Sequence, residues 1–225
     1  MTNKLEEMSA FFNSRADDYN EVHLGHVGGM ESKNLVASFL PGHTKTIIDI
    51  GVGTGLELAG IFERFPDAEV TGLDIAKNML QLLKETYPGK KIKLHCQSYL
   101  DYDFGTNLYD AAASVMTLHH YTHEVKTDLY CKIRNCIKQN GVYVECDYML
   151  SKHEHENPQQ LEDFYFSEYK RLKDEQRITD NREYHYDTPC TVDNQIKMLL
   201  EAGFSKVSEV WRRHNGNSVI LVAEK

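Results

Sequence analysis

The chain has 225 residues, a length that suits one large domain or one domain carrying an insertion, and we expect the latter. Its net charge of −9 and pI near 5.6 argue against a surface that binds phosphate backbones, so we expect no nucleic-acid partner. The five cysteines form no Cys-x-x-Cys pair, which favours reduced thiols in the cytoplasm, and no apolar run is long enough for a membrane span.

The first forty residues, 1–40, are expected to form a helical cover for the rest of the domain. Residues 4–20 carry apolar side chains at helical spacing and predict a helix that ends near Asn20. The glycine-rich stretch 23–30 predicts a flexible loop, whose His23 and His26 either meet a substrate or are solvated. A second helix is predicted at 31–39, before Pro41-Gly42.

The most informative stretch is 46–55, where a short apolar strand runs into a loop with glycine at every second position: Gly51, Gly53 and Gly55. Glycines permit a tight turn and let a ligand approach the backbone. A helix predicted at 56–65 would point its free N–H groups at that ligand. A dinucleotide pyrophosphate requires Gly-x-Gly-x-x-Gly, but Leu56 holds the position of the third glycine. The next strand, 69–73, ends in Asp74, where a carboxylate can accept both hydroxyls of a ribose.

With these residues the chain resembles the class I S-adenosylmethionine-dependent methyltransferases. The resemblance rests on Asp49-x-Gly51-x-Gly53-x-Gly55, on Asp74, and on the strand pair that ends the chain. It implies that S-adenosylmethionine is the cofactor, with the loop against its methionine part and Asp74 on its ribose. It also implies a cofactor site that includes the following residues: Tyr19, Asp49, Gly51, Gly53, Gly55, Asp74, Ile75, Gln97, Ser98 and Met116.

The resemblance also implies an α/β fold, a seven-stranded, mostly parallel, doubly wound sheet with an antiparallel C-terminal hairpin. Phe12-x-x-x-Ala16-x-x-Tyr19 is similar to the N-terminal stretch that covers the cofactor in many small-molecule methyltransferases. After a predicted helix at 77–87 and a strand at 92–96, the chain reaches Gln97-Ser98-Tyr99. Many family members set an acid there against the adenine amino group. Here Gln97 stands in that place, with Tyr99 or Asp101 as alternatives.

The fourth strand, predicted at 109–116, ends in a polar turn that contains His119, His120 and His123. Ligands of open α/β sheets bind outside the carboxyl ends of the strands, so this turn falls near the reactive methyl group. Neutral imidazole is a common metal ligand. Relatives that use a metal carry glutamates in this turn, where this chain has Met116 and His119, so we expect no metal. His119 either contacts substrate or is structural, and His120 is expected to bond nearby backbone.

The fifth strand, predicted at 142–148, ends in Asp147 and Tyr148 at the same edge of the sheet. A carboxylate there can hold a substrate amine or take a proton, whereas the alternative is a turn acid exposed to water. The strand follows a predicted amphipathic helix at 124–138 that Asn140-Gly141 would close. Tyr148 and Tyr19 would help to exclude water.

Residues 151–189 are polar and aromatic and show no strand pattern. We interpret them as an inserted lid with a helix at 159–177 that selects the acceptor; the alternative is an outer helix that packs by one stripe. A capped helix at 191–202 follows. Two strands, 205–213 and 218–223, then form a hairpin through Asn215-Gly216, a strong hairpin signal.

The sequence therefore predicts a single methyltransferase domain, 1–225, that methylates a small-molecule acceptor, with His119 and Asp147 as the catalytic candidates. An in-line arrangement of acceptor, methyl carbon and sulfur would supply much of the acceleration. One alternative is a regulatory or partner subunit that binds S-adenosylmethionine without turnover. A nucleotide-dependent oxidoreductase is disfavoured by the glycine spacing and by the hairpin. The acceptor and the oligomeric state stay open.

Overall fold

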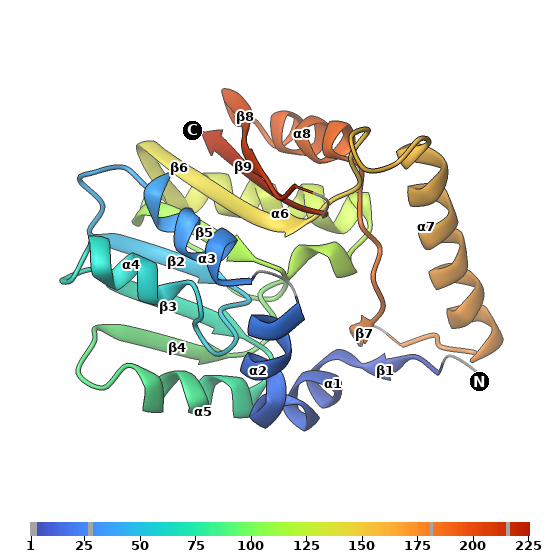
Figure 1. Cartoon of the computed structure of the whole chain (residues 1–225), viewed down its shortest axis with the longest axis horizontal. Helices are drawn as coiled ribbons and strands as arrows, with labels where there is room; N and C mark the ends of the chain where they lie inside the picture. The colour runs from blue at the N-terminus through green and yellow to red at the C-terminus, as the bar shows by residue number, and fades with distance from the viewer. Residues whose placement is uncertain (1–3, 27–28, 181, 215–216) are drawn as a thin grey trace.

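The computed structural model describes residues 4–26, 29–180, 182–214 and 217–225 (Figure 1). Its centre is a seven-stranded sheet in the order β4-β3-β2-β5-β6-β9-β8. The first five strands in this order are parallel, and β9 runs antiparallel to both β6 and β8. The strands are β2 (Thr46–Ile50), β3 (Glu69–Asp74), β4 (Ile92–Cys96), β5 (Tyr109–Val115), β6 (Ile137–Tyr148), β8 (Lys206–Arg212) and β9 (Ser218–Glu224). The fold class and the antiparallel terminal hairpin are confirmed.

The central strands are apolar because both faces of the sheet are covered. Successive side chains of a strand point to opposite faces, so Ile48 and Ile50 join one core cluster while Ile47 joins the other. One cluster lies under α3 (Gly29–Ser38) and α4 (Leu58–Arg64), with α5 (Lys77–Thr86) contributing Leu80 and Leu83. The other lies under α6 (His123–Cys136) and α8 (Val192–Glu201).

The N-terminal segment differs from the prediction of one helix ending near Asn20. The chain forms α1 (Met8–Ser14) and α2 (Ala16–His26), separated at Arg15, and Asn20 lies within α2. The predicted loop at 23–30 is also wrong on both sides of residues 27 and 28, because α2 continues to His26 and α3 begins at Gly29. Residues 27 and 28, and the side chains of His23 and His26, lie outside what the structure describes.

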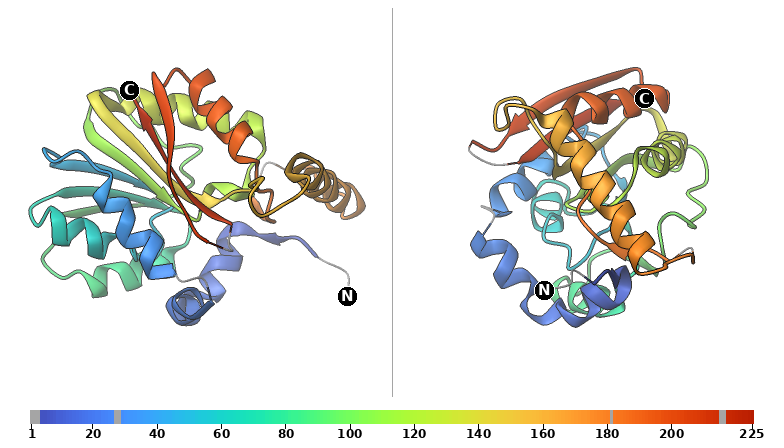
Figure 2. Two further views of the ribbon diagram at one scale, coloured as in Figure 1. Left: turned by 45° about the horizontal axis from the view of Figure 1, so that its top comes forward. Right: turned by 90° about the vertical axis from the view of Figure 1, so that its right-hand side faces the viewer.

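A second, two-stranded sheet joins the N-terminus to the insertion, against the expectation that 151–189 holds no strand. In it, β1 (Glu6–Glu7) pairs antiparallel with β7 (Tyr184–His185). Two residues per strand are too few to give a periodic signal, and the partner is far away in the chain. The insertion also contains α7 (Pro158–Glu175), whose buried residues are Pro158, Glu162 and Leu172. Figures 1 and 2 show α7 and the N-terminal helices at the same end of the sheet.

The junction between α6 and β6 was also predicted wrongly. The helix ends at Cys136, and β6 begins at once at Ile137 instead of after Gly141. The register with β5 shifts there, because Tyr109 faces Ile137 and Ala111 faces Val142. A Cβ at Gly141 would lie 2.3 Å from the Ile137 side chain, so this bulge requires glycine.

The C-terminal elements follow the prediction. Thr191 caps α8 by accepting a hydrogen bond from the Asn194 N–H at 3.2 Å, and Gly203 follows the helix with φ +95°. The predicted Asn215-Gly216 turn lies outside the described residues, but β8 and β9 on either side of it pair as expected. In the described part of the chain, no helix is long and apolar enough to cross a bilayer.

Candidate active site

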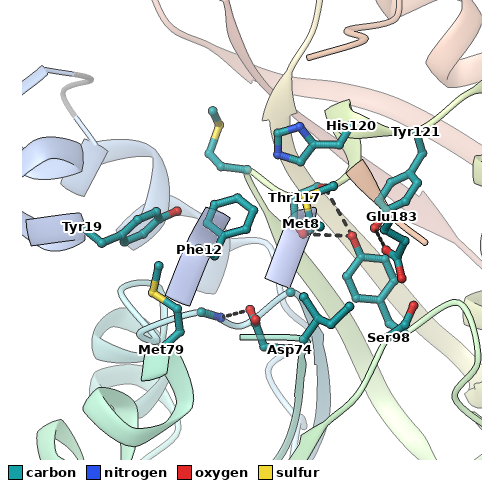
Figure 3. Close-up of a pocket in the computed structure, with 15 residues that line it drawn as sticks. Met8, Phe12, Tyr19, Asp74, Met79, Ser98, Thr117, His120, Tyr121 and Glu183 are labelled. Atoms are coloured by element: carbon teal, nitrogen blue, oxygen red, sulfur yellow. Dashed lines mark hydrogen bonds between the residues drawn. The ribbon is translucent and has the colours of Figure 1, made fainter. Parts of the chain in front are cut away.

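Two adjoining cavities lie beyond the carboxyl ends of the parallel strands. The first is lined by the glycine loop and by the ends of β3, β4 and β5 (Figure 3). The second has a volume of about 540 Å³ and is lined by α1, α2, the turn after β5 and the end of β7. Both are lined by Phe12, Tyr19, Met116 and His120, so these four residues form a wall that the two cavities share.

Gly51 and Gly53 have different roles in the glycine loop. Gly51 has φ +72°, and a Cβ there would lie 2.1 Å from the Thr117 Oγ1, so the loop packs directly on the turn after β5. Gly53 has φ +51°, but the nearest protein atom to its Cβ position is the Asp74 Oδ2 at 3.9 Å. Gly53 lines the first cavity, so the space that a side chain would fill is open to a ligand.

Asp74 connects the loop to the end of β3. Its Oδ2 accepts the Gly53 N–H at 2.9 Å and its Oδ1 accepts the Ala76 N–H at 2.7 Å. Burial raises the pKa of this carboxyl to about 6, although the two N–H donors oppose the rise. Each carboxylate oxygen can accept a further hydrogen bond, so Asp74 keeps acceptor capacity for a vicinal diol in the cavity.

Three predicted cofactor residues do not line either cavity: Asp49, Gly55 and Gln97. Asp49 is fully buried beneath the loop, where burial and the neighbouring Glu57 raise its pKa well above the ordinary value. A Cβ at Gly55 would lie 3.0 Å from the side chains of Leu58 and Leu83, so this glycine allows helix packing. Gln97 is exposed, and the neighbouring Ser98 and Tyr99 line the cavity.

The first cavity is nearly closed by the N-terminal helices. Met8, Phe12 and Tyr19 lie over it, and about 40 Å³ of space remains. That volume holds a few water molecules at most. A nucleoside-sized ligand therefore requires α1 and α2 to move outward when it binds.

His119 and Asp147 form a buried pair at the wall of the second cavity. The His119 Nδ1 lies 2.5 Å from the Asp147 Oδ1, and the Asp147 Oδ2 accepts the Leu118 N–H at 2.8 Å. Burial alone would lower the pKa of His119, but the charge and hydrogen bond of Asp147 outweigh it and raise the pKa. The same pairing outweighs burial at Asp147 and lowers its pKa. With Nδ1 held by Asp147, Nε2 is the nitrogen left for a ligand.

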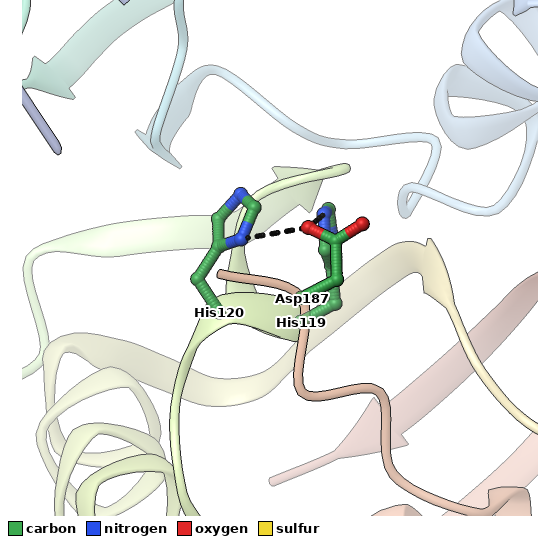
Figure 4. Close-up of side chains that lie close together, drawn as sticks. All are labelled: His119, His120 and Asp187. Atoms are coloured by element: carbon green, nitrogen blue, oxygen red, sulfur yellow. Dashed lines mark ion pairs between the residues drawn. The ribbon is translucent and has the colours of Figure 1, made fainter. Parts of the chain in front are cut away.

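Asp187 reaches the same place from the insertion (Figure 4). One of its oxygens lies 3.2 Å from the His120 Nδ1 and 3.7 Å from the His119 Nε2, so these three residues are close enough to hold a cation. The His120 Nδ1 also lies 3.3 Å from the carbonyl oxygen of Tyr186. A nitrogen between a carboxylate and a carbonyl carries its proton as a donor. We therefore interpret this cluster as hydrogen-bonded.

The insertion contributes cavity residues that the sequence prediction missed. Glu183 lines the first cavity and accepts a hydrogen bond from the Tyr121 hydroxyl. His185 and Asp187 line the second cavity. Burial lowers the pKa of His185 to about 4. Burial would raise the pKa of Asp187, but the nearby histidines outweigh it and lower this pKa to about 2. No motif or spacing marks these positions. The β1–β7 pairing brings them to the sheet.

Comparisons with known proteins agree with this geometry. A family model described as a methyltransferase domain matches residues 47–141. A carboxy-S-adenosyl-L-methionine synthase of Nautilia profundicola is 24% identical over 187 residues, which cover 81% of this chain and 78% of that protein. Human N-acetylserotonin methyltransferase, solved with S-adenosylmethionine, matches with a TM-score of 0.68 at 15% identity over 98% of this chain and 59% of its own.

A third comparison is the 1,6-didemethyltoxoflavin-N1-methyltransferase of Burkholderia thailandensis, solved with bound 1,6-didemethyltoxoflavin and S-adenosylhomocysteine. It matches with a TM-score of 0.64 at 16% identity, over 97% of this chain and 87% of that one. The chain spans about three fifths of the length of several other solved structures it matches, including the human enzyme. The strand order and these matches show that the chain has the fold of the class I S-adenosylmethionine-dependent methyltransferases, and its glycine loop and Asp74 lie within the segment that matches the methyltransferase-domain model.

Proposed function

We propose that the chain transfers the methyl group of S-adenosylmethionine to a small molecule held in the second cavity. The observation that carries this proposal is the shared wall of the two cavities, with the His119–Asp147 pair beside it. The cofactor supplies a methyl group already activated by its sulfonium, so that positioning of the acceptor provides much of the acceleration.

The residues that line the first cavity suit this cofactor once α1 and α2 have moved outward. Gly53 leaves room beside the backbone, and Asp74 offers acceptors for the ribose hydroxyls. We infer that Ile75, Ser98 and Met116 form the walls, since all three line this cavity. Tyr19 closes it from above. Asp49 and Gly55 act by shaping the loop, and Gln97 follows β4 outside the cavity.

His119 is the residue that would accept a proton from the acceptor. Asp147 takes the Nδ1–H, which leaves the lone pair of Nε2 for a hydroxyl or a protonated amine. Asp187, 3.7 Å from Nε2, would stabilise the imidazolium that results. Tyr148 and Tyr19 line the second cavity and would limit access of water.

The division of the chain supports separate roles for its segments. Within the proposed single domain 1–225, α1 and α2 of the cover 1–40 line both cavities, whereas α3 packs on the sheet; the proposed lid 151–189 contributes Asp187 and His185 to the second cavity. The second cavity has the size of a small-molecule site. Its aromatic walls include the ring of Phe11, which stacks on the ring of His185 with 3.5 Å between the ring centroids. All five cysteines are free thiols, which supports a reducing compartment such as the cytoplasm.

The test is transfer of label from methyl-labelled S-adenosylmethionine to a pool of small metabolites. The wild type and a control, His153→Ala, should label the same product, because His153 lies outside both cavities. His119→Ala should bind the cofactor yet label little product. If the wild type binds S-adenosylmethionine but labels nothing in any pool, the chain is a cofactor-binding regulatory or partner subunit instead.

A further inference from the structure

A second cluster of ligating side chains lies away from both cavities. It consists of His123 at the start of α6, Glu162 in α7, and Cys190 just before α8, and their donor atoms all lie within 4.8 Å of one another. Glu162 and Cys190 are buried, whereas 37% of the His123 side chain is exposed. Three segments far apart in the sequence therefore place one sulfur, one nitrogen and one oxygen at a single point.

The donor set and its spacing suit zinc. Zinc binds thiolate at about 2.3 Å and imidazole or carboxylate at about 2.0 to 2.2 Å, so tetrahedral donors are roughly 3.3 to 3.6 Å apart. The His123 Nε2 and the Glu162 Oε1 are 2.8 Å apart, so a small separation of the two side chains would admit the ion. A thiolate favours zinc over magnesium or calcium, which prefer oxygen alone.

Neighbouring groups already orient two of these donors, as outer hydrogen bonds do in metal sites. Glu162 accepts the side-chain N–H of Asn194 at 2.8 Å and also the Thr191 N–H. The Lys126 ammonium donates a hydrogen bond to the Cys190 Sγ at 3.1 Å. One thiolate and one carboxylate balance a dication. Lys126 also interacts electrostatically with the nearby carboxylates of Asp147 and Glu145.

The exposed side of His123 provides the access that a metal site needs. His123 lines a surface cavity of about 560 Å³ together with Phe166 and Tyr169 of α7. The His123 Nε2 itself is buried, so an ion entering from this cavity would reach the donors as the His123 side chain moves, and water could take the fourth position. The His119, His120 and Asp187 cluster is less suited to zinc, because the His120 Nδ1 faces a carbonyl oxygen as well as Asp187.

We propose that His123, Glu162 and Cys190 form a zinc site that fastens the N-terminal half of α7 to α6 and to the start of α8. This half of α7 is held by the buried Pro158 and Glu162, by Phe166 packed on the core, and by a hydrogen bond from Asn194 to Gln159, and the ion would add to these contacts. The ion would hold one end of α7 fixed, while its far end packs through Leu172 against Leu5 and Tyr184. This site is separate from methyl transfer and does not depend on the proposed reaction.

The experiment is titration of the chelator-treated full chain with zinc, and with cobalt as a spectroscopic probe. We expect one equivalent of zinc, a thiolate-to-cobalt absorption band, and slower hydrogen exchange in the first half of α7 when zinc is added. Cys190→Ser should abolish the band and weaken zinc binding by about a hundredfold or more, beyond the usual effect of losing an outer hydrogen bond. Cys131→Ser, a cysteine outside the cluster, should change neither.

His123→Ala provides a second variant at a partly exposed position, in case Cys190→Ser disturbs folding. It should also lose zinc, and circular dichroism would verify that each variant is folded. His119→Ala should keep full zinc affinity. The proposal is overturned if the folded wild type takes up no zinc, if the cobalt band survives in Cys190→Ser, or if zinc is lost in His119→Ala and kept in His123→Ala.

Discussion

Replacement of Asp147 by asparagine tests the role of the His119 pair most sharply. Asparagine preserves the shape and can still accept the Leu118 N–H, but it removes the negative charge 2.5 Å from the His119 Nδ1. A hydrogen bond to a charged group contributes about 1.5 to 3 kcal/mol, and one pKa unit corresponds to about 1.4 kcal/mol. The pKa of His119 should therefore fall by about one to two units in Asp147→Asn.

The direction of the pH effect depends on which protonation state of His119 is active. His119 accepts a proton only when neutral, and its pKa is raised above the ordinary value, so wild-type activity should rise with pH through that raised pKa. In Asp147→Asn the rising limb should move to lower pH. The asparagine NH₂ would also donate to Nδ1 and shift the ring proton to Nε2, so turnover should fall by up to the roughly hundredfold to ten-thousandfold associated with general acid–base catalysis.

The assay is the pH profile of kcat and kcat/KM on the acceptor found by labelling, with cofactor affinity measured in parallel. Asp67→Asn, an exposed position outside both cavities, is the matched control and should leave the profile unchanged. An unshifted limb with unchanged turnover in Asp147→Asn would refute the reasoning and move the catalytic role away from His119. Loss of activity to a chelator in Cys190→Ser, which lacks the proposed zinc site, with recovery on adding a divalent metal, would instead favour His119 and His120 as ligands.

Three further predictions concern the cofactor and the insertion. Asp74→Ala should weaken S-adenosylmethionine binding by about 1.5 to 3 kcal/mol in calorimetry. Because the pKa of Asp74 is about 6, the affinity of the wild type for S-adenosylmethionine should fall as the pH drops below that value. Unchanged affinity in Asp74→Ala, or tight NAD binding by the wild type, would contradict the assignment of Asp74 to the ribose. Gly51→Ala should lower the thermal stability more than Gly53→Ala, because only the first forces a 2.1 Å contact, whereas Gly53→Ala should mainly weaken cofactor binding; equal losses of stability would argue against this division. In the metal-free protein, hydrogen exchange in 151–189 should be faster than in 46–50, and equal protection would indicate a rigid outer helix.

The elements that could be predicted are those whose signals are local. The strand at 46–50 and its glycine loop combine an apolar run with a turn that only glycine fits, and Asp74 follows at the end of the next strand. These residues meet because parallel strands share one carboxyl edge. His119 and Asp147 could be paired in advance for the same reason, and the structure brings them within 2.5 Å.

The elements that were missed depend on distant contacts. The β1–β7 pairing brings Glu183 and Asp187 to the cavities, yet two-residue strands leave no pattern in the sequence. The break at Arg15 is equally invisible, since apolar side chains keep helical spacing on either side of it. The sequence spacing of His123, Glu162 and Cys190 does not predict that they lie close together, because their proximity depends on the packing of α6, α7 and α8.

The most direct measurement is a crystal structure of the full chain with S-adenosylhomocysteine. The account predicts that its ribose contacts Asp74, that its amino-acid part lies along Gly51 and Gly53, and that its sulfur faces the cavity that contains His119. It also predicts that α1 and α2 lie farther from the sheet, since only about 40 Å³ is free beneath them. A ligand bound elsewhere, or one whose sulfur points away from the second cavity, would contradict the account.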